Sequence, residues 1–204
     1  MRERIAAWLF RQLIQHVSGL RPPDFVVGHD NPEGAYLRRW YITPWRGWYR
    51  AVPEDQRTLW QRAAVALAHL LPNLYLHQFL RDDDDRALHD HPSWAVSFIL
   101  HGAYLEHTVD DAGVARRRMH RAGSLRFLPL LHTHRIELLR EVVGIDPENE
   151  AAPYRVQPAP CWTLFLFGPK RREWGFHCEG GRWVPWQEFT ATGKPGEVGK
   201  GCDA

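Results

Sequence analysis

The feature that most constrains the fold is a series of short strand-like runs in the second half of the chain. From Trp94 onward, apolar or alternating stretches such as SWAVSFILHGAYLEHTV, SLRFLPL and CWTLFLFG are separated by turn residues. The stretch DDAGVARRRMHRAG predicts a hairpin with a tight turn at Asp111 to Gly113. Many short strands at regular spacing are typical of a β-barrel or a β-sandwich. The sequence therefore predicts a mainly β fold.

Helical patterns are confined to the first half of the chain. Ile5, Leu9, Leu13 and Val17 recur every four residues, which predicts an amphipathic N-terminal helix packed on its own domain. The stretch VPEDQRTLWQRAAVALAHLLP predicts a second, inserted helix that starts after its first proline and ends at its last. The stretches AYLRRWYITP and NLYLHQFL on either side of this helix predict strands.

The chain length of 204 residues suits one structural domain. We expect residues 1–72 to hold the helical decoration and the first barrel strands, and residues 73–189 to form the barrel. The remaining residues, 190–204, lack aromatic side chains and are predicted to form a flexible tail.

Composition excludes several classes of function. A formal net charge of +2 is weak, and the longest basic run, Arg116 to Arg118, predicts a solvated strand rather than a nucleic-acid surface. The N-terminal helix is too interrupted by polar residues for a membrane span or a signal peptide. Cys161, Cys178 and Cys202 are odd in number and show no CxxC spacing, which favours free thiols and a cytoplasmic location over a disulfide framework.

Two histidines separated by one residue suggest a metal site. In extended backbone, residues i and i+2 point to the same side, so His89 and His91 present two imidazoles to one face. Two neutral imidazole nitrogens can bind one cation at roughly 2.0–2.1 Å each. A further histidine, His134, lies eleven residues beyond Gly123 in the stretch GSLRFLPLLHTH.

These residues resemble the two conserved motifs of the cupin superfamily. The first cupin motif runs glycine, five residues, HxH, three or four residues, glutamate, six residues, glycine. The second runs glycine, five residues, PxG, two residues, histidine. The matching residues here are His89, His91 and Gly102 in the first motif, and Gly123, Pro129 and His134 in the second. The resemblance covers about a quarter of the chain, roughly residues 83 to 138.

The resemblance implies a cupin-type double-stranded β-helix, a jelly-roll barrel, decorated by the N-terminal helix and the inserted helix. It also implies that His89, His91 and His134 point inward onto a divalent metal ion. Fe(II) is the expected ion, with Zn, Mn or Ni as alternatives. The substrate would be a small molecule, and a homodimer is an open possibility.

Three departures from the cupin motifs matter. Asp83 stands at the leading glycine of the first motif, and Leu131 stands at the glycine after the proline of the second. The motif glutamate falls at Ala95 or Val96, neither of which can bind a metal. Three histidines without a carboxylate resemble the ligand set of cupins that act as thiol dioxygenases.

Other polar residues are candidates around such a site. His132 shares strand parity with His134 and is either an alternative ligand or a proton carrier. Glu106 and Glu137 are the other candidates for a fourth ligand. Tyr104 and His132 are the candidate catalytic residues for proton transfer. Arg126 alternates with Ser124 and could bind a carboxylate, although an exposed position is favoured.

Several further residues have less specific interpretations. The run Asp82 to Asp85 lacks the alternation of a calcium loop, so we expect a solvated loop between Arg81 and Arg86. Some of these aspartates could instead accept the free N–H of a metal-bound imidazole. Asp90 points away from the histidine pair by parity. His77 is expected to be a hydrogen-bonded core histidine, while His177 is left open and His120 is expected at the surface or in packing.

The C-terminal aromatic residues are the least informative feature. They are expected either to pack the barrel exterior or to form pocket walls or a dimer interface, and they are Trp162, Trp174, Trp183 and Trp186.

The function that the sequence favours is a non-haem iron oxygenase that acts on a small molecule through three histidines. The alternatives are a cupin that binds a metal or small ligand without turnover, and a cupin isomerase or epimerase. Fold alone does not decide among these classes.

Overall fold

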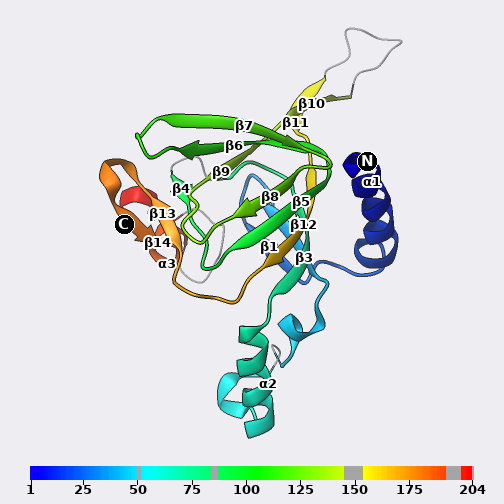
Figure 1. Ribbon diagram of the computed structural model, residues 1–204, viewed down its shortest axis with the longest axis vertical. Coiled ribbons are helices and arrows are strands. Elements are labelled where there is room, and N and C mark those ends of the chain that lie inside the picture. Colours follow the sequence, from blue (N-terminus) through cyan, green and yellow to red (C-terminus); the bar gives the residue numbers. More distant parts are fainter. Residues whose placement is uncertain (50–51, 84–86, 145–153, 192–198, 204) are drawn as a thin grey trace.

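The computed structural model describes residues 1–49, 52–83, 87–144, 154–191 and 199–203 (Figure 1). Antiparallel strands dominate it, which confirms the mainly β prediction. The strands are β1 (Phe25–Val27), β2 (Leu37–Tyr41), β3 (Asn73–Phe79), β4 (Leu88–His89), β5 (Ala95–His101), β6 (Ala103–Val109), β7 (Ala115–Arg121), β8 (Leu125–Leu128), β9 (Arg135–Leu138), β10 (Arg140–Val143), β11 (Arg155–Pro158), β12 (Cys161–Phe167), β13 (Gly175–His177) and β14 (Trp183–Pro185).

The strands form two sheets that pack face to face and two smaller sheets. The large sheet has the order β1-β2-β3-β12-β5-β8, and the sheet opposite it has the order β7-β6-β9. A third sheet has the order β14-β13-β4, and β10 pairs with β11. One core cluster joins the two facing sheets, because its members come from both: Leu37, Phe79, Ile99 and Cys161 from the large sheet, and Tyr104, Ile136 and Leu138 from the other. The space between these sheets is the interior of the fold.

The N-terminal helix α1 (Arg2–Leu13) covers the outer face of the large sheet (Figure 1). It continues as a π-helical turn over Ile14–Ser18. Leu9, Leu13 and Val17 pack against the sheet as predicted, whereas Ile5 is 45% exposed. Their partners on the sheet include Trp40, Leu76, Leu100, Phe98, Trp162 and Leu164. The prediction of a helix packed on its own domain is confirmed.

The inserted helix α2 (Leu59–Leu70) starts later than the sequence predicts. Residues Glu54–Gln56 form a separate 3-10 turn after Pro53. The α-helix begins at Leu59 and is capped by Thr58, whose hydroxyl accepts from the Gln61 backbone while the Gln61 side chain accepts from the Thr58 backbone. This capping box satisfies two backbone donors at the helix start and outweighs the proline signal. The helix projects from the body, as Figure 1 shows.

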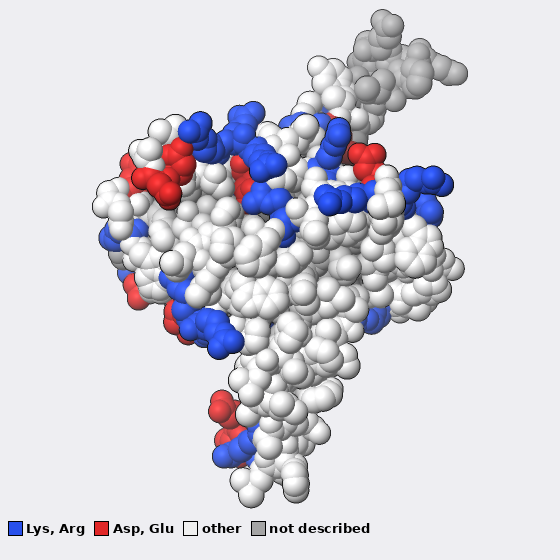
Figure 2. Space-filling view, in the orientation of Figure 1, with Lys and Arg blue, Asp and Glu red and all other residues white. Residues whose placement is uncertain are grey.

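The predicted hairpin is formed by β6, a turn at 110–113 and β7. The Asp110 carboxylate accepts from the backbone N–H groups of Ala112 and Val114, which holds the turn. The arginine run Arg116 to Arg118 lies on β7 and is exposed, as predicted. Figure 2 shows arginine and lysine side chains over the upper edge of the view, where Figure 1 places β7.

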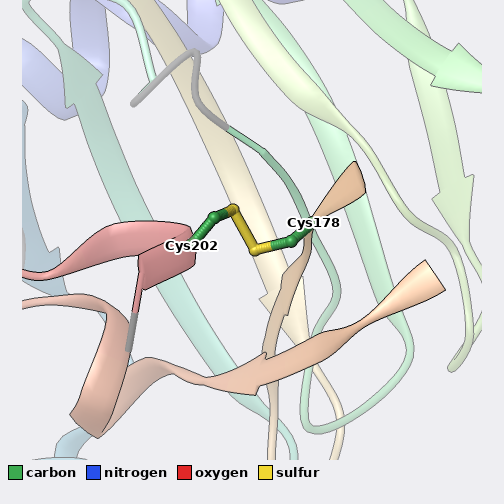
Figure 3. Close-up of a disulfide and its surroundings, with 2 residues drawn as sticks. All are labelled: Cys178 and Cys202. Atoms are coloured by element: carbon green, nitrogen blue, oxygen red, sulfur yellow. A yellow bond between two sulfur atoms is a disulfide. The ribbon is translucent and has the colours of Figure 1, made fainter. Parts of the chain in front are cut away.

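The expectation of unpaired cysteines is wrong for two of the three. Cys178 and Cys202 form a disulfide (Figure 3). Cys161 is a free, buried thiol. The disulfide ties residues 199–203 to the end of β13, whereas residues 192–198 of the predicted tail lie outside the described residues. Short-range spacing did not indicate the pair because the two cysteines are 24 residues apart.

None of the helices among the described residues is long and apolar enough to cross a membrane.

Candidate metal centre

The three predicted histidine ligands converge inside the fold. His89 on β4 and His134, just before β9, form an isolated antiparallel bridge. The N–H of each residue donates to the carbonyl of the other, at 2.8 and 2.9 Å. His91 follows two residues after His89, so its ring lies on the same side, 5.1 Å from the His89 ring between centroids. The structure therefore brings together the residues that the two motifs predict.

The ring nitrogens are spaced for a common ion. His91 Nε2 and His134 Nε2 are 2.9 Å apart, and one nitrogen from each of the three rings lies within 4.8 Å of the others. Two nitrogens at right angles on an ion with bonds of roughly 2.0–2.1 Å would be about 3 Å apart. The spacing therefore suits neighbouring positions on one divalent ion.

Burial keeps the imidazoles of His89 and His91 in the form that binds metal. Burial lowers the pKa of His89 to about 4, although the charge of Asp83 raises it. Burial, together with the nearby His134 and His89 rings, lowers the pKa of His91 well below its ordinary value. Neutral imidazoles carry the lone pairs that a metal requires.

Glu106 fixes the orientation of His134. Its Oε1 lies 3.0 Å from His134 Nδ1, and Glu106 is only 2% exposed. Burial opposes ionisation of Glu106, but hydrogen bonds from His120, His132 and His134 hold its pKa well below its usual range. An ionised carboxylate can only accept, so His134 Nδ1 carries the proton and Nε2 presents its lone pair to the other histidines.

The carboxylate of Glu106 has three further partners. His120 Nε2 lies 3.1 Å from one oxygen and His132 Nε2 lies 2.9 Å from the other. Arg126 contacts both oxygens through its two terminal nitrogens. The expected exposed position of Arg126 is therefore wrong, and of the two positions expected for His120, at the surface or in packing, the structure shows the packed one. Both lie inside the fold, because a buried carboxylate requires compensating donors.

A second group of potential ligands consists of Glu106, His132 and His134. This group meets His134 through Nδ1, whereas His91 meets His134 through Nε2. The two nitrogens of an imidazole point away from each other, so Glu106 cannot bind the same ion as His91. Arg126 already supplies a positive charge beside Glu106. Glu106 therefore lies behind His134, and the candidate site has three histidines and no carboxylate.

Glu137, the other candidate carboxylate, lies elsewhere. It alternates along β9 with the core residues Ile136 and Leu138, so its side chain faces outward. Its Oε2 lies 2.7 Å from His107 Nε2.

Tyr104, the candidate proton donor, is buried in the core cluster between the facing sheets. Its ring centroid is 5.6 Å from that of His120. Burial raises its pKa well above the ordinary value, and the charge of Glu106 adds to this effect. His120 contacts Glu106, which in turn contacts His134, so these residues connect Tyr104 to the three histidines.

The first two aspartates of the acidic run are held by the fold rather than fully solvated, in contrast to the prediction, with Asp83 largely buried and Asp82 partly exposed. Asp83 accepts a hydrogen bond from the backbone of Ile136 at 2.7 Å, and Asp82 accepts from Leu138 at 2.7 Å. These two hydrogen bonds attach the loop that precedes β4 to the backbone of β9. Asp83 Oδ2 is 3.7 Å from His89 Nδ1, which is too long for a hydrogen bond. Asp84 and Asp85 lie outside the described residues.

Asp90 points away from the histidines, as predicted, and organises the C-terminal hairpin. It is 1% exposed and accepts from the backbone of Gly175 at 2.9 Å. Its Oδ2 also lies 2.7 Å from Arg172 Nη1, 2.9 Å from His177 Nε2 and 3.1 Å from Trp183 Nε1. These contacts give His177, whose role was left open by the sequence, a structural role as a partner of Asp90. They also hold β13 against β4.

The C-terminal tryptophans pack within the chain. Trp162 lies under α1 against Phe10 and Trp40. Trp174 stacks on Trp186 and lies 6.3 Å from the His89 ring. The packing interpretation therefore holds, and Trp174 also forms one wall beside the histidines.

No protein-family model and no curated protein sequence matches the chain. Among solved structures, it is similar to an oxalate decarboxylase from Lactobacillus farciminis in complex with formate: 15% identity, 78% of this chain, 34% of that chain and a TM-score of 0.41. A variant of the Bacillus subtilis oxalate decarboxylase is similar at 17% identity over 48% of this chain and 21% of that chain, with a TM-score of 0.33. A double-stranded β-helix protein from Klebsiella pneumoniae is similar at 12% identity over 52% of this chain and 69% of that chain, also with a TM-score of 0.33.

The facing antiparallel sheets and the three inward histidines agree with what the resemblance to the cupin motifs implies. The chain spans about one fifth to one third of the length of the oxalate decarboxylases. At these identities and TM-scores, the activities of those proteins carry no argument for this chain.

Proposed function

We propose that this chain is a metal-binding cupin that acts as a non-haem iron oxygenase on a small molecule. The observation that carries the proposal is the convergence of His89, His91 and His134, with His91 Nε2 and His134 Nε2 2.9 Å apart and the His134 tautomer fixed by Glu106. Structural zinc sites are normally closed by four protein ligands. Three neutral histidines leave coordination positions open, which favours a catalytic role.

The three histidines would hold Fe(II), which would supply a Lewis-acidic centre with open positions for dioxygen and a substrate group. The protein's own residues position and insulate the site. Glu106 keeps the His134 lone pair on the metal side, and Trp174 and Phe176 pack beside His89. Tyr104 and His132 stay proposed proton carriers, with His132 the nearer, at 5.2 Å between its ring and that of His134.

The test begins with protein purified without added metal. Iron, zinc, manganese and nickel are quantified, and oxygen consumption is measured with a panel of thiols and keto acids. Near-stoichiometric iron and substrate-dependent oxygen uptake support the proposal. Stoichiometric zinc or manganese without uptake would favour a binding role, or an isomerase or epimerase.

A variant pair makes the metal test specific. The H91A substitution removes a proposed ligand, and H69A removes an exposed histidine on α2. We expect H91A to lose the bound metal and H69A to keep it. Equal metal content in the two variants would overturn the three-histidine site.

A homodimer and a cytoplasmic location stay predictions. The Cys178–Cys202 disulfide is a type of bond that persists mainly in oxidising compartments, so it removes the basis on which the cytoplasmic location was predicted.

A further inference from the structure

Three polar side chains form a row across the inner face of the large sheet. Arg39 on β2 is directly opposite His77 on β3, and His77 is directly opposite Thr163 on β12. Their neighbours two positions along, Leu37, Phe79 and Cys161, belong to the core cluster between the facing sheets. The residues of opposite parity pack under α1. The row Arg39–His77–Thr163 therefore faces the interior.

Two members of this row have polar atoms without a partner. Arg39 Nε donates to His77 Nε2 at 2.8 Å. A guanidinium only donates, so neutral His77 carries its proton on Nδ1. Neither His77 Nδ1 nor Thr163 Oγ1 has a hydrogen-bond partner in the described structure, and both atoms are buried. Such groups are rare in proteins, because each one costs free energy unless something satisfies it.

The charge of Arg39 also has no counterion in the part of the chain that the structure describes. No described carboxylate forms a salt bridge with it, and its terminal nitrogens donate to no described residue. Its guanidinium carbon instead lies 4.8 Å from the centre of the Tyr75 ring. By contrast, Arg126 pairs with Glu106 and Arg172 pairs with Asp90. Among the described residues, Arg39 therefore has no carboxylate partner, in contrast to Arg126 and Arg172.

The row lies one aromatic ring away from the metal centre. The Phe165 ring is 4.9 Å from that of His77 and 6.4 Å from that of His91. Arg39, Phe165 and His91 all keep partial exposure, whereas His77 and Thr163 are buried. A small molecule at the partly exposed end of the interior would contact both groups.

The charges of the interior favour a negative ligand. Three neutral imidazoles leave a divalent ion with its full charge, and Arg39 adds a further positive charge. Glu106 does not offset them, since Arg126 pairs with it. An anion between the metal and Arg39 would compensate both, through charge-assisted hydrogen bonds.

We propose that Arg39, His77 and Thr163 form a carboxylate-binding subsite, so that the natural ligand of the interior is a small organic acid. A second functional group of this acid would bind the metal, and that part of the proposal rests on the proposed function. The carboxylate subsite itself does not. Arg39 would pair with the carboxylate, and His77 Nδ1 and Thr163 Oγ1 would donate to it.

The experiment measures binding of acetate and of acetamide, its uncharged counterpart, to metal-free and zinc-loaded protein by NMR titration. Acetate should bind at least about tenfold more tightly than acetamide, and R39Q should weaken acetate binding by at least about tenfold. The matched control is R38Q, since Arg38 is the neighbouring residue on the same strand and is exposed on the outer face. Equal acetate affinity in R39Q and R38Q would overturn the subsite.

A second variant separates binding from folding. T163V removes the partnerless hydroxyl and keeps the side-chain volume. We expect it to weaken acetate binding several-fold while its urea midpoint stays equal or rises. An unchanged acetate affinity in T163V would exclude Thr163 from the subsite.

The outcomes also distinguish the two proposals. A chain that binds no metal but needs Arg39 for acetate refutes the proposed function and supports the subsite. A chain that retains zinc in R39Q and binds acetate independently of Arg39 refutes the subsite and leaves the three-histidine metal site standing.

Discussion

His89 and His134 face each other across a two-residue antiparallel bridge, and each backbone N–H donates to the carbonyl of the other. The two motifs, which are far apart in sequence, therefore meet through the backbone before any metal is considered. His89 also pairs with Phe176 on β13, so the ligand strand is held on both sides. The positions of the side chains follow from this pairing, and metal binding does not have to create them.

The E106Q substitution should weaken metal binding. A glutamine keeps the shape but removes the charge that fixes the His134 proton on Nδ1, and loss of such a partner typically costs 10–100-fold in metal affinity. Competition with a chelator measures the change. The control is E137Q, because Glu137 pairs with His107 on the outer face. Equal affinities in E106Q and E137Q would show that Glu106 does not act on the metal ligand.

The D90N substitution should destabilise the fold. Asp90 is buried, and four donors from the C-terminal hairpin surround its carboxylate. Breaking a buried ion pair costs about 3–5 kcal/mol, and we expect the lower end because Arg172 is partly exposed. Urea unfolding gives the value. The E173Q control alters an exposed pair with Lys170, and a D90N effect no larger than that control would contradict the assignment.

Removing the disulfide should lower the free energy of unfolding by about 3 kcal/mol, because the loop that it closes spans 24 residues. The double variant C178S/C202S and reduced wild-type protein should show the same shift. Reductant should have no further effect on the double variant. A reductant-sensitive double variant would mean that another bond is responsible.

The sequence predicts the ligands of the site but not their surroundings. His89, His91 and His134 could be named as candidate ligands because strand parity gives the first two one face and the resemblance to the cupin motifs adds the third. The side of the strand on which Glu106 lies could not be predicted, because in AYLEHTV each of the two faces carries both polar and apolar side chains. Only the pairing of β6 with β7 and β9 shows that Glu106 faces inward.

The row Arg39–His77–Thr163 illustrates the same limit. Each of its members comes from a different strand, and the sequence carries no information on which residues of β2, β3 and β12 are directly opposite. His77 was correctly predicted as a core histidine with a hydrogen bond. Its partner and its unsatisfied nitrogen become visible only with the register of the large sheet.

Thiol labelling should show a strong dependence on pH and folding. Burial raises the pKa of Cys161 from the ordinary 9.0 to about 12. Native protein should therefore not react with iodoacetamide at pH 8, while unfolded protein should expose one thiol and reduced, unfolded protein three. Because the unfolded thiol ionises first, stability should fall as the pH rises from about 9 towards 12. Rapid labelling of native protein at pH 8 would show that Cys161 is accessible.

The G102A substitution should destabilise the hairpin between β5 and β6 more than G113A destabilises the turn between β6 and β7. Both glycines have a φ of +77°, so an alanine at either position costs about 1–2 kcal/mol from backbone strain alone. A Cβ at Gly102 would also lie 2.6 Å from the Pro160 carbonyl oxygen, whereas one at Gly113 meets nothing within 4 Å.

The difference between the two variants isolates the steric contribution, which we expect to be about 1–3 kcal/mol. Urea unfolding of both variants measures it, and the slope of each transition checks that the unfolded states are alike. Equal losses would mean that β5 and β12 are not packed as closely as the structure shows. The glycine that closes the first motif would then be required only for its backbone angle, and not for the approach of the chain before β12.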